Sequence, residues 1–128
     1  MSIILDQTTR ILVQGITGSE GRFWTKHMLD YGSKVVAGVT PGKEGETVEG
    51  IPVYNSVRRA VDEHTIEASI LFVPPRFAKD ALFEALSCGI KKVVILCEGI
   101  PLHDTLQMRK AAITEQAIVI GANTSGLI

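Results

Sequence analysis

The 128 residues are enough for one folded domain, and since 45% are apolar but only 5% aromatic, its core should be aliphatic. Thirteen basic and fourteen acidic side chains leave a formal charge of −1, which excludes the basic surface expected of a nucleic-acid-binding or anionic-membrane-binding protein. No apolar stretch reaches the length of a membrane span, so we expect no membrane partner and a cytoplasmic protein.

Short apolar runs alternate with helical patterns along the whole chain. Apolar runs without polar alternation are typical of buried strands, whereas longer segments with a 3.6-residue period are typical of helices. In chain order we expect a strand at 11–13, a helix at 19–31, a strand at 35–39, a loop at 40–50, a short segment at 51–54, a helix capped by Ser56 and ending near Glu63, a strand at 68–73, a helix at 77–88, a strand at 93–96, a helix at 104–114 and a strand at 117–120.

Single residues refine three of these elements. Pro52 has no N–H to donate to a neighbouring strand, so the segment 51–54 is predicted to lie at the edge of the sheet. Ser56 is a residue type that caps helix N-termini through its hydroxyl oxygen. His27 falls within the first predicted helix, where we expect it to pack against or beside the sheet.

The order of the elements predicts the fold class. Apolar strands separated by helices indicate an α/β protein with a Rossmann-like, doubly wound, mainly parallel sheet and helices on both faces. Its crossover connections should be right-handed. No linker or low-complexity tract interrupts the chain, so residues 1–128 are predicted to form one domain.

A glycine-rich turn, from Gly15 to Gly21, separates the first strand from the first helix. Backbone N–H groups and the positive end of a helix dipole meet at this place in a doubly wound sheet, which suits a phosphate. Gly15 would permit the tight turn, Gly18 the approach of a ligand and Gly21 close helix packing, while Thr17 and Ser19 add hydroxyl donors. The alternative is that the glycines serve packing alone.

The residues after the second strand bear on the kind of nucleotide. An NAD site would have an acid here to bind the ribose hydroxyls, but this chain has Lys43. A lysine fits a phosphorylated ribose, such as the 3′-phosphate of coenzyme A or the 2′-phosphate of NADP. The alternative is a solvated surface lysine, since Lys43 lies beside Glu44 and Glu46 in a glycine-rich loop.

Several segments together resemble one known family. They match, in order and over nearly the whole chain, the N-terminal coenzyme A domain of succinate–CoA ligase (succinyl-CoA synthetase) α subunits, and more widely the CoA-binding family that includes ATP-citrate lyase. The matching segments are residues 14–21, 38–43, 50–57, 72–77 and 98–101. The resemblance implies coenzyme A as the ligand, and as the parent reaction the nucleotide-dependent synthesis of succinyl-CoA in the tricarboxylic acid cycle.

The resemblance also implies the contacts of each part of coenzyme A. By this resemblance, the phosphate and pantetheine end is lined by Thr17, Gly18, Ser19 and Glu20; the 3′-phosphate is bound by Lys43; the adenine is flanked by Val39 and Pro41; the nucleotide and pantetheine are bordered by Val73, Pro74 and Pro75; and the pantetheine arm is approached by Leu96, Cys97 and Glu98. All of these positions follow strands, where doubly wound sheets bind their ligands.

Two departures from the family limit what the resemblance implies. Residues 121–126 read Gly-Ala-Asn-Thr-Ser-Gly where the family has Gly-Pro-Asn-Cys-Pro-Gly, so this turn is expected to be looser. The family's phosphohistidine lies in a further domain, and His27, His64 and His103 are not in its context. We therefore expect the chain alone to make no acyl-CoA and to accept no phosphate from ATP or GTP. Its expected partners are coenzyme A or acyl-CoA, and a ligase β subunit or C-terminal ligase domain.

Other chemistry has little support in the sequence. Cys88 and Cys97 are predicted to be free thiols, and neither a catalytic residue nor a metal site is predicted. Two alternatives to a ligase domain remain: an NADP-binding dehydrogenase fragment, and a stand-alone coenzyme A-binding protein without catalysis.

Overall fold

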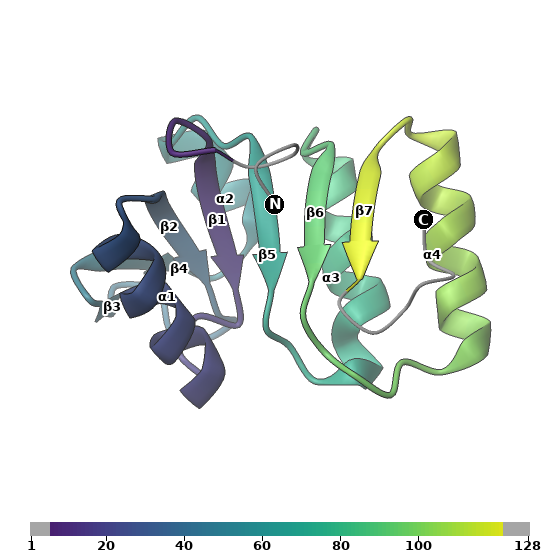
Figure 1. Cartoon of the computed structure of the whole chain (residues 1–128), viewed down its shortest axis with the longest axis horizontal. Helices are drawn as coiled ribbons and strands as arrows, with labels where there is room; N and C mark the ends of the chain where they lie inside the picture. Colours follow the sequence, from purple (N-terminus) through teal and green to yellow (C-terminus); the bar gives the residue numbers. More distant parts are fainter. Residues whose placement is uncertain (1–5, 122–128) are drawn as a thin grey trace.

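The computed structural model describes residues 6–121 as a seven-stranded sheet with four helices (Figure 1). The strands are β1 (Arg10–Gln14), β2 (Lys34–Val39), β3 (Thr47–Val48), β4 (Ile51–Tyr54), β5 (Ala68–Leu71), β6 (Lys92–Ile95) and β7 (Ile118–Gly121). The helices are α1 (Ser19–Tyr31), α2 (Val57–Glu63), α3 (Pro75–Ser87) and α4 (Leu102–Thr114). The turn that was predicted to be looser lies, after Gly121, outside the described residues.

The strand order is β3-β4-β2-β1-β5-β6-β7, and every neighbouring pair is parallel except β3 with β4. The chain therefore begins in the middle of the sheet, builds outward through β2 to β3 and β4, and returns to the other side of β1 as β5. This confirms the predicted doubly wound, mainly parallel α/β fold. The reversal at the β1–β5 seam is the place where such sheets bind ligands.

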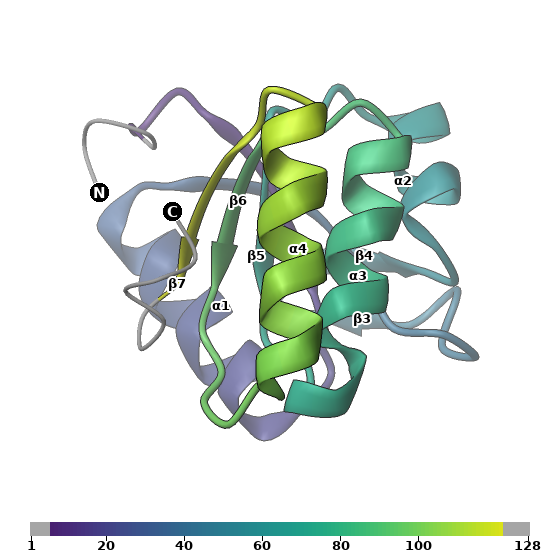
Figure 2. The same cartoon turned by 90° about the vertical axis from the view of Figure 1, so that its right-hand side faces the viewer.

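Helices cover both faces of the sheet, as predicted. Figure 1 draws α1 in front of the sheet and α2 and α3 behind it, and Figure 2 shows α3 and α4 side by side. The core consists of two buried clusters, which pack different helices against the sheet. One buried cluster joins α2, α3 and α4 to the sheet through residues such as Val57, Leu82 and Met108, and the other joins Ile16 and the partly buried Met28 of α1 to Ile70.

Helix α1 turns its small residues toward the sheet and its aromatic residues outward. Gly21 and Thr25 are buried, whereas Phe23 and Trp24 are exposed to 52% and 42%. The expectation that His27 packs against or beside the sheet was wrong: it is exposed, and its ring centroid lies 4.3 Å from that of Phe23. The inner face of α1 is formed by Gly21 and Thr25 and, further along, by the partly buried Met28 and Leu29, so His27 falls on the outer side.

The segment between β2 and α2 differs from the prediction in two ways. The expected loop at 40–50 contains the short strand β3, and β4 is internal, between β2 and β3. Pro52 is tolerated there because the N–H of Val53 points to β3, donating to Glu46 O at 3.0 Å. The N–H directions of successive strand residues alternate, so the nitrogen of Pro52 faces β2. The β2–β4 ladder begins only at Val53, so no hydrogen bond is lost at Pro52.

Two helices begin two residues before their predicted starts, and both do so at prolines. Pro75 is the first residue of α3, and α4 begins directly after Pro101. Proline suits this position because its φ angle is helical and the first N–H groups of a helix have no partner within the helix. The predicted cap of α2 is confirmed: the Ser56 hydroxyl accepts from Arg59 N at 3.2 Å, a contact worth about 0.5–2 kcal/mol.

Candidate functional site

The glycine turn between β1 and α1 is shaped by two glycines that have no room for a side chain. Gly15 has a φ of +83°, and a Cβ added to it would collide with the carbonyl oxygen of Phe72. A Cβ on Gly21 would collide with the carbonyl oxygen of Gly15. Gly18 differs, because the nearest atom to its added Cβ is 3.6 Å away. Gly15 and Gly21 are therefore required by the fold, whereas the bare backbone at Gly18 is open on the outside.

The N-terminus of α1 points its unpaired N–H groups at this open side. Gly18 is the N-cap residue, and no side chain within residues 6–121 caps the helix. The turn is held from behind, since Thr17 Oγ1 lies 3.1 Å from Thr40 Oγ1 and Arg22 Nε donates to Thr17 O at 2.9 Å. An anion at Gly18 would meet free donors and the positive end of the helix dipole.

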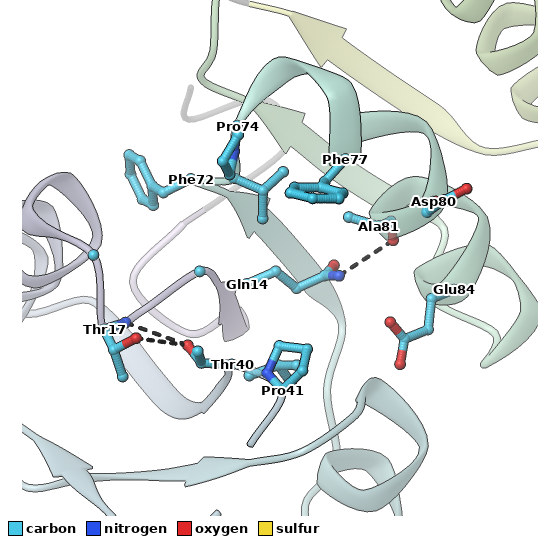
Figure 3. A pocket seen from close by; sticks show the side chains of 14 residues that line it. Gln14, Thr17, Thr40, Pro41, Phe72, Pro74, Phe77, Asp80, Ala81 and Glu84 are labelled. Carbon is cyan, nitrogen blue, oxygen red and sulfur yellow. Dashed lines mark hydrogen bonds between the residues drawn. The ribbon is translucent and has the colours of Figure 1, made fainter. Parts of the chain in front are cut away.

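A first hollow of about 460 Å³ extends from the glycine turn to α3 (Figure 3). Its floor is Gln14, whose amide is fixed by two hydrogen bonds, one from Ser69 Oγ at 2.7 Å and one to Ala81 O at 3.2 Å. Its walls are mainly apolar. They are formed by Gly15, Thr17, Gly18, Val39, Thr40, Pro41, Phe72, Val73, Pro74, Phe77, Asp80, Ala81 and Glu84. The hollow suits a flat, mainly apolar group such as a nucleotide base.

A second hollow of about 650 Å³ adjoins the first and leads to the end of β6. The two share Gly18 and three residues after β5, so they form one continuous cleft at the carboxyl ends of β1, β2, β5 and β6. The second hollow is lined by Gly18, Ser19, Glu20, Trp24, Phe72, Val73, Pro74, Pro75, Leu96, Cys97 and Glu98. Burial raises the pKa of the Cys97 thiol above that of an ordinary cysteine, so at neutral pH it is a neutral, weakly nucleophilic group.

The cleft brings together every residue predicted for the site except Lys43. Thr17, Val39 and Pro41 line the first hollow, Ser19, Glu20, Pro75 and 96–98 line the second, and the remaining three line both. Lys43 lies outside, in the loop after β2, with 51% of its side chain exposed and its Nζ 3.8 Å from Glu46 Oε2.

Sequence reasoning missed the wall that α3 contributes. Phe77, Asp80, Ala81 and Glu84 face the first hollow from one side of that helix. Their spacing of three and four residues is the available signal, beside the buried stripe of Ala78, Leu82 and Ala85. Gln14, Thr40, Phe72 and Trp24 were missed as well.

The charged side chains that line the cleft are negative. The charged residues that line the two hollows within residues 6–121 are all acids, namely Glu20, Asp80, Glu84 and Glu98. Any anionic part of a ligand must therefore be bound by backbone N–H groups or by a cation from outside the two hollows. Lys43 is two residues beyond Pro41, which lines the first hollow. In the same part of the chain, no group of three or more acids, histidines or cysteines is arranged to hold a metal ion, and no helix is long and apolar enough to span a membrane.

This architecture agrees with a known family. A model described as the CoA binding domain matches residues 6–99, which contain the glycine turn and both hollows. The chain belongs to the CoA binding domain family. The resemblance expected from the sequence is thereby confirmed, and so is the relation to ligase α subunits, since curated relatives align along the whole chain.

Two relatives and one solved structure illustrate the relation. An ADP-forming sulfoacetate-CoA ligase subunit from Acholeplasma sp. is 60% identical over all 128 residues, which are 43% of its length, and succinate–CoA ligase [ADP-forming] subunit alpha 1 from Archaeoglobus fulgidus is 50% identical over all of this chain and 44% of its own. This chain thus spans less than half the length of these relatives. The ATP citrate lyase of Methanothrix soehngenii, solved with citrate and coenzyme A, has the same fold, with a TM-score of 0.79 and 22% identity over 92% of this chain and 21% of that one.

Proposed function

We propose that this chain binds coenzyme A or an acyl-CoA along the continuous cleft, as the nucleotide-binding part of an acid–CoA ligase subunit. The observation that carries the proposal is the meeting of two hollows at Gly18. One hollow is shaped for a base, the other leads away along the ends of β5 and β6, and free backbone donors lie between them. A nucleotide joined through a diphosphate to a long flexible arm has this order of parts.

In this arrangement each part of coenzyme A has its own surroundings. The adenine lies between Val39 with Pro41 and the residues after β5, and the diphosphate lies over Gly18 at the N-terminus of α1. The pantetheine arm runs past Pro74 and Pro75 toward the carboxyl end of β6, where Leu96, Cys97 and Glu98 surround its thiol end. Lys43 reaches the 3′-phosphate from the loop after β2.

The names of the curated relatives support a ligase as the parent enzyme. They are subunits of ADP-forming CoA ligases, so we propose that the whole protein forms a thioester of coenzyme A with a carboxylic acid at the expense of ATP, together with a second subunit. We place the phosphoryl-carrying histidine outside these 128 residues, because His27 is exposed on α1 and neither hollow is lined by a histidine of the described chain.

The second candidate function is that of an NADP-binding, dehydrogenase-like domain, because Lys43 would equally suit the 2′-phosphate of NADP. Calorimetric titration of the chain with coenzyme A, dephospho-coenzyme A and NADP tests the two candidates. We expect coenzyme A to bind at least tenfold more tightly than NADP, since only coenzyme A has an arm to fill the second hollow. Tighter binding of NADP would replace the proposed function with a dehydrogenase-like one.

A further inference from the structure

Two backbone turns close the loop that carries Lys43, residues 40–46, because Lys43 N donates to Thr40 O at 3.1 Å and Glu46 N donates to Lys43 O at 3.1 Å, but its glycines and its exposure leave it few other restraints of its own. Gly42 and Gly45 both have positive φ angles, +84° and +97°, and a Cβ added to either would meet no atom within 4 Å. Residues 41–46 are all exposed. Fixing such a segment costs backbone entropy at every residue that becomes ordered. A lysine on a free loop would lose much of its contribution to binding in ordering the loop.

Asn55 and Arg59, which lie outside the loop, add side-chain contacts to these backbone hydrogen bonds. The Oδ1 atom of Asn55 accepts from Gly42 N at 2.9 Å and from Glu44 N at 3.3 Å, so one oxygen binds the two N–H groups that flank Lys43. In return, Asn55 N donates to Glu44 Oε1 at 3.0 Å, and Arg59 Nη2 donates to Glu44 Oε2 at 2.9 Å. Asn55, Glu44 and Arg59 together form the loop clamp.

The loop clamp also changes the electrostatics around Lys43. An unpaired Glu44 beside Lys43 would attract its ammonium group and repel a phosphate. The Arg59 guanidinium, followed by the backbone N–H of Asn55, lowers the pKa of Glu44 and offsets its charge. The remaining pair, Lys43 with Glu46 at 3.8 Å, is half exposed, and such pairs contribute little, so Lys43 can exchange this partner for a doubly charged phosphate.

We propose that Asn55 is a positioning residue for the phosphate contact of Lys43, supported by the Glu44–Arg59 pair. The inference rests on the proposed function, because it concerns how the same site discriminates coenzyme A from ligands that lack the 3′-phosphate. The loop clamp presets the backbone on both sides of Lys43 before the ligand arrives, which removes an ordering cost from binding. The lysine head group stays free to move.

The test compares affinities for coenzyme A and dephospho-coenzyme A in the unmodified chain, Lys43→Ala, Asn55→Ala and the double variant. We expect the unmodified chain to prefer coenzyme A by about ten- to a hundredfold. Asn55→Ala should reduce this preference by about fivefold or more while changing the affinity for dephospho-coenzyme A less than about twofold. The double variant should lose no more preference than Lys43→Ala alone, since both changes act on one contact.

Arg59→Ala should act in the same direction and carries the test if Asn55→Ala does not fold. Arg58→Ala is the matched control: it removes the same charge from another exposed position of α2 that lies outside the loop clamp, so the preference should stay unchanged. If Asn55→Ala and Arg59→Ala both keep the preference of the unmodified chain for coenzyme A, or lose affinity equally for both ligands, the inference is overturned. The proposed function would still stand. An unmodified chain that binds no coenzyme A overturns the proposed function and this inference together.

Discussion

Lys43 is separated from the cleft itself, so its contribution to binding can be measured without altering the shape of either hollow. A charge-assisted contact with the 3′-phosphate is worth about 1.5–3 kcal/mol, so Lys43→Ala should weaken coenzyme A binding by about ten- to a hundredfold. Binding of dephospho-coenzyme A should barely change. High salt should narrow the preference of the unmodified chain, since Lys43 is half exposed. If the two ligands keep the same affinity ratio in the variant, Lys43 is only a solvated loop residue.

Cys97 offers a chemical probe of the second hollow. Because burial raises its pKa, alkylation by iodoacetamide should accelerate only at a pH above that needed for an ordinary thiol. Coenzyme A should slow the reaction further if its pantetheine arm occupies the hollow. Mass spectrometry can follow Cys97 and Cys88 separately, and Cys88, which lines neither hollow, serves as the control. Equal rates at Cys97 with and without coenzyme A would argue against this path for the arm.

Asp6 gives the stability of the chain a dependence on acid. Hydrogen bonds from the hydroxyl and backbone of Thr8, and then from Thr9, lower its pKa in the folded state. The stabilisation is therefore fully present above the unfolded-state value of about 4 and is lost as the pH falls through and below it. Urea unfolding should find Asp6→Asn less stable than the unmodified chain at pH 7 but equal to it near pH 2. Equal stability of the two chains at pH 7 would contradict this account of Asp6.

At the scale of elements, the packing of α1 on the glycine turn predicts that substituting one glycine affects stability and substituting another affects ligand binding. Gly21→Ala should destabilise the fold by about 1–3 kcal/mol, because its methyl group would collide with the backbone at Gly15. Gly18→Ala should leave the free energy of unfolding nearly unchanged, since its Cβ has 3.6 Å of space, but should weaken ligand binding by narrowing the cleft. Urea unfolding and calorimetric titration of both variants separate the two roles. The reverse assignment of effects would remove the argument for a ligand at Gly18.

The elements predicted correctly from the sequence are those whose own residues determine them. Apolar runs identified the strands at the centre of the sheet, and glycine and serine marked the boundaries of α1 and α2. Strand β3 was missed because a two-residue strand depends on pairing with Ile51 and Pro52, not on its own composition. The placement of His27 was wrong because His27 shares the exposed side of α1 with Phe23 and Trp24.

The candidate site, like the fold, could be predicted from the sequence only in part. Residues that follow strands could be assigned, because the carboxyl ends of parallel strands meet at one edge of a sheet. The wall from α3 could not, since Phe77, Asp80 and Glu84 mix apolar and acidic side chains and are brought to the cleft only by the packing of the helix. The loop clamp was equally hidden, because it joins Glu44 to residues eleven and fifteen positions further along the chain.

For the molecule as a whole, the β1–β5 seam divides the sheet between the two ends of the chain. Every strand on the β2 side comes from residues 10–54, and every strand from β5 onward comes from residues 68–121. The exposed Thr65 lies in the connection between them. Separately expressed fragments 1–65 and 66–128 should therefore each contain one contiguous half of the sheet and reassemble through the β1–β5 ladder.

The ligand cleft lies on this seam, with Pro41 on one fragment and Val73 on the other. A ligand that binds only the reassembled pair shifts the association by mass action, by about a hundredfold at a ligand concentration one hundred times its dissociation constant. Coenzyme A should thus strengthen the association of the two fragments, which analytical ultracentrifugation can measure. Free pantetheine, which lacks the nucleotide, should strengthen it far less. Association that is indifferent to coenzyme A would place the ligand on one half alone. The same geometry would make the split chain a sensor, reporting the concentration of coenzyme A by whether its two halves are joined.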